Sequence, residues 1–87
     1  MSNSQRHAIE ARLARIEGHI HGVHKMAHEG RSYPELVHQI AAIRASLDSV
    51  LQAIVEDLVQ EIITVAPTKG RATPVIEELR EVVANAL

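Results

Sequence analysis

The chain contains no cysteine, no tryptophan and no phenylalanine, and Tyr33 is its single tyrosine. The lack of cysteine excludes disulfides, thiolate metal sites and thiol-based sensing. A core without large aromatic rings must consist of Leu, Ile, Val, Ala and Met, which favours packed helices over a sandwich of sheets. No apolar run approaches the roughly 18 residues of a membrane helix, and no signal peptide is recognisable. We therefore expect a cytoplasmic protein without a membrane partner.

The 87 residues are enough for one domain, predicted to span residues 1–87, with a core small enough that oligomerisation is expected to enlarge it. The net charge is −2, but the charges are unevenly placed. Residues 1–31 hold five basic and three acidic side chains, whereas residues 32–87 hold four basic and eight acidic ones. A local basic patch, repeated by symmetry, can bind phosphates. Charge by itself favours an ordinary solvated helix face over a phosphate-binding patch.

The spacing of apolar residues predicts three helices and an all-α fold. Residues 4–29 carry a heptad seam, with Ser4 as N-cap and Gly30 just past the end. Glycines within that helix either permit close approach of another backbone or are simply tolerated.

The second helix is predicted over residues 33–65, capped by Ser32 or Tyr33, with Pro34 at its first position. Its apolar stripe is too wide for one partner, which predicts a long antiparallel helix pair that forms a four-helix bundle in a dimer. A break over residues 66–70 precedes a third helix at 74–86, with Thr73 as N-cap.

Three sequence elements carry a resemblance to a known family: RLARIEGHIHG in the first helix, a Tyr-Pro turn, and QIAAIRASLD in the second helix. Together they resemble the CsoR/RcnR/FrmR family of copper-, nickel/cobalt- and formaldehyde-responsive repressors. The similarity runs without a gap over about residues 6–65. It implies a dimer of antiparallel helix pairs assembled into a dimer of dimers, which binds operator DNA and is released by its effector.

The chain departs from this family at its sensing positions. Tyr33 stands where the resemblance implies the key cysteine, and Leu58 and Ile62 stand where it implies the His-x-x-x-Cys or His-x-x-x-His pair. Leucine and isoleucine have no donor atom, and tyrosine is a poor ligand for copper(I). Glu78 matches a glutamate of the third helix that, by the resemblance, supports the copper site. We expect Tyr33, Leu58 and Ile62 either to seal the sensor cavity or to shape a pocket for an uncharged ligand.

The resemblance also assigns candidate DNA contacts. Arg12 and Arg15 match basic positions of the first helix, and Arg44 matches the arginine of the second-helix motif. Arginine donates two hydrogen bonds at once to a phosphate. The copper branch often has a further basic residue where this chain has Ser49, which reduces the expected basic face.

Six histidines occur in the chain, and several recur at helical spacing. One stripe of the first helix consists of Glu17, His21, His24 and His28. Imidazoles at this spacing bind zinc, nickel, cobalt or copper(II), with His38 or a second subunit as a further donor. Plain solvent-exposed residues explain the stripe more simply, because nothing in the sequence orients the rings. Protonated histidines would also strengthen phosphate binding. His7 and His19 lie off the stripe and are interpreted as surface residues or phosphate contacts.

No Ser-His-Asp order, glycine-rich phosphate loop or HExxH motif occurs, so an enzyme is not predicted. We predict a homo-oligomeric DNA-binding repressor, dimer or tetramer, without the usual Cys/His sensor site and with its effector left open. No cofactor is expected unless a transition metal (zinc, nickel, cobalt or copper) occupies the histidine stripe. Two alternatives remain: a metal-responsive repressor that uses this stripe, and a helical oligomerisation module without DNA binding of its own.

Overall fold

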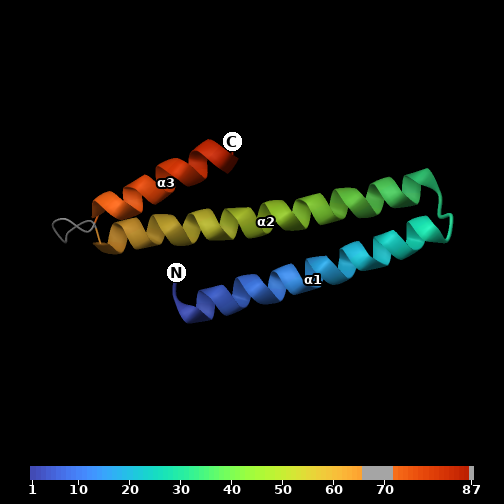
Figure 1. Ribbon diagram of the computed structural model, residues 1–87, viewed down its shortest axis with the longest axis horizontal. Coiled ribbons are helices and arrows are strands. Elements are labelled where there is room, and N and C mark those ends of the chain that lie inside the picture. The colour runs from blue at the N-terminus through green and yellow to red at the C-terminus, as the bar shows by residue number, and fades with distance from the viewer. Residues whose placement is uncertain (66–71, 87) are drawn as a thin grey trace. The chain divides into compact units, whose positions relative to one another are not determined.

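Three helices make up the structure, a computed structural model that describes residues 1–65 and 72–86 (Figure 1). They are α1 (Asn3–His28), α2 (Tyr33–Val65) and α3 (Ala72–Ala86). No strand occurs in these two ranges, and the predicted all-α, three-helix fold is confirmed. The predicted helix ends agree with the observed ones to within two residues. The predicted break at residues 66–70 lies outside the described residues.

The contacts within the chain group into two units. The hairpin unit comprises residues 2–51, which are α1, the turn and the first part of α2. The second unit comprises Met1 and the residues from Gln52 onward, which are the rest of α2 and α3. No helix in the described part of the chain is both long and apolar enough to cross a membrane.

The first helix begins close to the predicted cap but is capped two residues earlier. Ser2, not Ser4, is the N-cap of α1. The Ser2 hydroxyl accepts from the Gln5 backbone N–H at 3.2 Å, while the Gln5 carboxamide oxygen accepts from the Ser2 backbone N–H at 2.9 Å. This reciprocal capping box satisfies two N–H groups that the helix leaves without partners. The prediction of Ser4 was wrong because Ser4 has no comparable partner three residues later.

Gly30 ends α1 as predicted. Its φ of 77° lies in the left-handed region, where a side chain is disfavoured. The Gly30 N–H donates to the Ala27 carbonyl at 3.2 Å, and the Arg31 N–H donates to the Met26 carbonyl at 3.1 Å. These two bonds form a Schellman motif, which satisfies the last carbonyls of the helix and turns the chain toward α2.

Ser32 caps the second helix. Its hydroxyl accepts from the Glu35 backbone N–H at 3.3 Å, and Tyr33 is already helical. Pro34 is therefore the second helical residue rather than the first, where its missing N–H is still harmless. Likewise, α3 begins at Ala72, so the prediction of Thr73 as N-cap was wrong.

The core of the hairpin unit is built from heptad-spaced residues. Ile16 and Val23 of α1 are buried, as are Ile43 and Val50 of α2. Each pair is seven residues apart, so both face the same side of their helix. Besides Tyr33, the unit leaves six large aliphatic side chains more than a third exposed: Leu13, Ile20, Val37, Ile40, Leu47 and Leu51. We call these six residues the apolar face.

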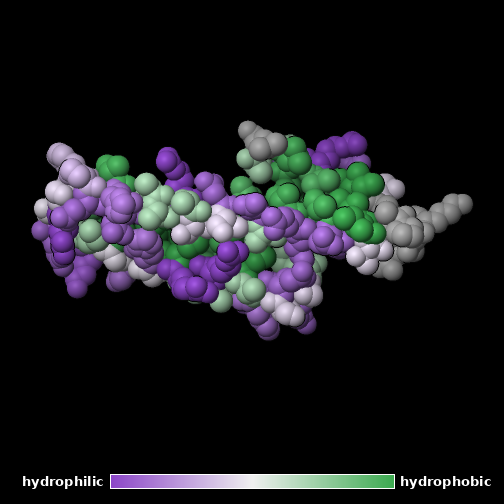
Figure 2. Space-filling model, turned by 180° about the vertical axis from the view of Figure 1, so that it is seen from behind, coloured by the Kyte–Doolittle hydropathy of each residue, from purple (hydrophilic) through white to green (hydrophobic). Residues whose placement is uncertain are grey.

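The second unit has its own small core and apolar surface. Leu58 of α2 and Val75 of α3 are buried. The amino group of Met1 lies 3.3 Å from a carboxylate oxygen of Glu61 and 4.0 Å from one of Asp57. Figure 2 shows hydrophobic surface gathered over α3 and the end of α2. Its exposed large side chains include Val59, Ile63, Ile76 and Val83.

Candidate nucleic-acid interface

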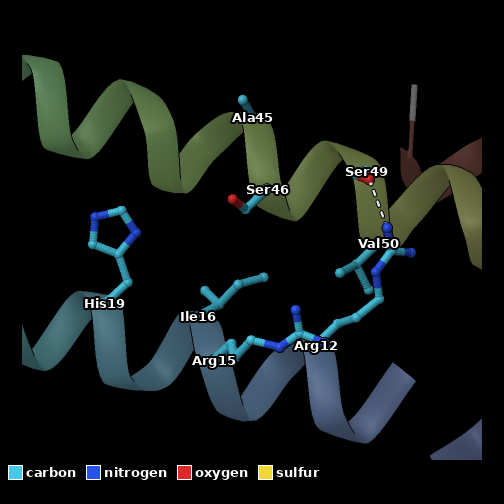
Figure 3. A pocket seen from close by; sticks show the side chains of 8 residues that line it. All are labelled: Arg12, Arg15, Ile16, His19, Ala45, Ser46, Ser49 and Val50. Carbon is cyan, nitrogen blue, oxygen red and sulfur yellow. Dashed lines mark hydrogen bonds between the residues drawn. The ribbon is translucent and has the colours of Figure 1, made fainter. Parts of the chain in front are cut away.

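A polar groove runs between the two helices of the hairpin unit, with a volume of about 440 Å³ (Figure 3). We call it the arginine groove. From α1 it is lined by Arg12, Arg15, Ile16 and His19. From α2 it is lined by Ala45, Ser46, Ser49 and Val50.

Helical spacing explains why these side chains meet. Arg12, Arg15 and His19 are three and four residues apart, so they project from one side of α1. Ser46 and Ser49 have the same relation on α2. Ile16 and Val50 are buried beneath them and hold the helices together. The groove is thus a polar rim over an apolar floor.

Arg12 bridges the two helices across this groove. Its Nη2 donates to the Ser49 hydroxyl oxygen at 3.1 Å, and the side chain is drawn toward α2 (Figure 3). Because Ser49 accepts this bond with its oxygen, the hydroxyl hydrogen remains available to another acceptor. Ser46 differs, since its hydroxyl donates to the Ala42 carbonyl at 3.0 Å. Of the two serines, Ser49 is the one placed to donate to a ligand.

His19 forms a second bridge between the helices. Its Nε2 lies 2.6 Å from the side-chain oxygen of Gln39, and both residues are half-buried. With the amide oxygen as acceptor, Nε2 carries the hydrogen. The interaction fixes the ring in the groove. His19 is therefore more than an exposed surface residue.

The charge of the arginine groove is uniformly positive. None of its lining residues is acidic. Within residues 1–65 and 72–86, Arg12 and Arg15 have no carboxylate within 4.0 Å. By contrast, Lys25, Arg31 and Arg80 each pair with a nearby glutamate three or four residues away. Two guanidinium groups without an acidic partner suit an anionic ligand.

Arg44, the third predicted DNA contact, does not line this groove. It is exposed, and helical spacing places it on the same side of α2 as Ile40, Leu47 and Leu51. These three belong to the apolar face. Within one protomer the structure brings Arg12 and Arg15 together but leaves Arg44 on the other side of the hairpin.

The histidine stripe lies along the solvent side of α1. All of its predicted members are exposed: Glu17, His21, His24, His28 and, on α2, His38. In the described part of the chain, no group of three or more His, Cys, Asp or Glu side chains is close enough to hold a metal ion. Three donors from one protomer are therefore not assembled there.

The positions matched to the family's sensor have different environments. Tyr33 is 85% exposed, Leu58 is buried, and Ile62 is half-buried. Glu78 is exposed on α3. Neither Leu58 nor Ile62 carries an atom that could coordinate copper or nickel, so this donor set does not fit a transition metal.

Comparison with known proteins identifies the class. Residues 5–85 match the family model of the metal-sensitive transcriptional repressors. The copper-sensing transcriptional repressor CsoR of Bacillus subtilis (strain 168) is 30% identical over 81 residues, which cover 93% of this chain and 80% of CsoR. The solved structure of the nickel-responsive transcriptional regulator InrS is similar with a TM-score of 0.82 and 39% identity, covering 100% of this chain and 94% of InrS.

The chain belongs to the family of metal-sensitive transcriptional repressors. The resemblance seen in the sequence is thereby confirmed, and the match extends beyond residues 6–65 to include α3. The absence of cysteine sets this member apart from a thiolate-based sensor.

Two residues of the arginine groove have a larger role than the sequence indicates. In the sequence, Ser49 occupies a position where the copper branch often has a basic residue. In the structure, its hydroxyl accepts a hydrogen bond from the Arg12 guanidinium. His19 has the pattern of a plain surface residue, yet it lies between the helices and contacts Gln39. The spacing of His19 from Arg12 and Arg15 is visible in the sequence, whereas its partner on α2 depends on the register of the hairpin.

Proposed function

We propose that this chain is a homo-oligomeric repressor that binds operator DNA through the arginine groove and lacks the family's cysteine-based sensor. The observation that carries the proposal is the pair Arg12 and Arg15, two guanidinium groups in a groove without a carboxylate. Arginine is the side chain best suited to the phosphate oxygens of DNA. Family membership supports a regulator rather than an enzyme.

The apolar face supports the oligomer. Buried Ile16 and Val23 mark the side of α1 that faces α2. Since successive residues of a helix are rotated by about 100°, Leu13 and Ile20 flank this seam on one side, whereas Arg12 and His19 flank it on the other. A second copy that covers the apolar face would complete a four-helix bundle and leave the arginine groove open to DNA.

The loss of the sensor rests on donor chemistry. No cysteine occurs anywhere in the chain, and Leu58 and Ile62 cannot bind a metal. We infer that this repressor does not respond to copper(I) or nickel through the family positions. A relocated site at the histidine stripe would need donors from more than one protomer, because the described part of one protomer does not assemble three.

The test is a fluorescence-anisotropy titration of the purified protein with the DNA upstream of its own gene, first metal-free and then with zinc, nickel, cobalt and copper. We expect binding that none of these metals changes. Release by one metal would show a sensor and favour the histidine stripe. No binding in any state would favour an oligomerisation module without its own DNA binding.

A further inference from the structure

We propose that the arginine groove is a seat for one phosphate group, formed by Arg12, Arg15, His19 and Ser49. The ligand of this seat would be a phosphate of the DNA backbone or a free phosphate group, because both present anionic oxygen atoms to the same hydrogen-bond donors. The inference deepens the proposed DNA binding and rests on it for the identity of the ligand.

The hydrogen-bond donors of the groove converge from both helices. Arg12 uses one of its five N–H donors on Ser49, which leaves the others for a ligand. Ser49 accepts that bond and can donate its own hydrogen outward. The guanidinium and the hydroxyl are thus held as a fixed pair, and a fixed donor pair loses little entropy when it binds an oxyanion.

His19 forms one wall of the seat. Its ring is held 2.6 Å from the Gln39 oxygen and lines the groove with the two arginines (Figure 3). The charged groups that line the groove with it are Arg12 and Arg15 on α1, and its neighbours Gln39 and Ser46 on α2 are neutral. This wall therefore brings no negative charge that would oppose a phosphate group.

The two serines of α2 provide a matched pair of variants. Ser49→Ala removes the partner of Arg12 and a donor of the seat, whereas Ser46→Ala removes a hydroxyl that is occupied with the Ala42 carbonyl. We expect Ser49→Ala to weaken binding to duplex DNA roughly tenfold, as for a lost hydrogen bond to a charged group. Ser46→Ala should leave the affinity unchanged. Equal affinities of the two variants would overturn the role of Ser49.

The histidines provide a second matched pair. His19→Ala removes the ring that bridges to Gln39 and lines the seat, whereas His21→Ala alters an exposed residue of the stripe. We expect His19→Ala to weaken binding to duplex DNA several-fold, because the seat loses one wall. His21→Ala should leave the affinity unchanged. Equal affinities of the two variants would remove His19 from the seat.

A nuclear magnetic resonance titration separates the seat from the DNA-binding function. Inorganic phosphate and duplex DNA are added in turn, and the side-chain signals of Arg12, Arg15 and His19 are followed. Shifts with both probes support the seat with DNA as its ligand. Shifts with inorganic phosphate but no DNA binding would refute the proposed function and leave a seat for free phosphate groups. DNA binding that leaves these three signals unmoved would overturn the seat itself.

Discussion

Arg12 on α1 and Ser49 on α2 are joined by a hydrogen bond of 3.1 Å across the groove between their helices. The two residues are 37 positions apart in the sequence, so this contact depends on the register of the hairpin. It converts a flexible arginine into an oriented donor at the surface where a repressor would meet DNA. The buried pair Ile16 and Val50 beneath it sets that register.

The salt dependence of DNA binding should distinguish charged from neutral contacts. Replacing Arg15 with alanine should reduce the slope of log K against log salt concentration by about 1, because one fewer condensed counterion is released. Ser49→Ala should lower the affinity without changing this slope, since a hydroxyl displaces no cation. Anisotropy titrations at several salt concentrations measure both. A slope that Arg15→Ala leaves unchanged would remove Arg15 from the phosphate contacts.

The apolar face should control the oligomeric state. Leu47 is 44% exposed in the protomer, and Leu47→Glu would bury a charge if a second copy covers it. We expect this variant to sediment as a smaller species than the wild type in analytical ultracentrifugation. Ala42→Glu, on the opposite side of α2, is the control and should keep the wild-type mass. An unchanged mass for Leu47→Glu would place the interface elsewhere.

Alanine substitutions of two glycines in the hairpin unit should change the stability of the protein in opposite directions. Gly30→Ala forces a side chain into the left-handed region at φ 77° and should destabilise the protein by about 1–2 kcal/mol. A Cβ at position 18 would meet no atom within 4 Å, so Gly18→Ala should stabilise α1 by about 0.5–1 kcal/mol. Urea unfolding followed by circular dichroism measures both. Destabilisation by Gly18→Ala would show that another subunit packs closely at this point.

The elements of this fold could largely be predicted from the sequence because they depend on local spacing. The heptad seam of Ile16 and Val23, and the glycine after α1, identify the helices and the turn. The N-cap of α1 is harder to predict from the sequence. Ser2 and Ser4 are equally good residue types for this position, and only the Gln5 side chain distinguishes them. Helix ends are decided by single hydrogen bonds, which a spacing pattern does not contain.

The candidate site could be predicted less completely than the fold. Arg12 and Arg15 are identified by the resemblance, and their joint position in one groove agrees with a shared role. Arg44 is grouped with them by the same resemblance, but it lies on the side of α2 that carries the apolar face. The contributions of Ser49 and His19 require knowledge of which α2 residues face α1. Sequence spacing defines the sides of one helix, whereas the pairing of two helices needs the structure.

The most direct test of this account is the affinity of Arg12→Ala/Arg15→Ala for the operator, measured by fluorescence anisotropy beside the wild type. Arg80→Ala is the matched control, because Arg80 is exposed and pairs with Glu77 outside the groove. We predict that the double variant loses roughly a hundredfold in affinity, as two charged contacts imply, with its helix content retained, and that Arg80→Ala binds like the wild type. A double variant that binds the operator as tightly as the wild type would contradict the assignment of the arginine groove to DNA.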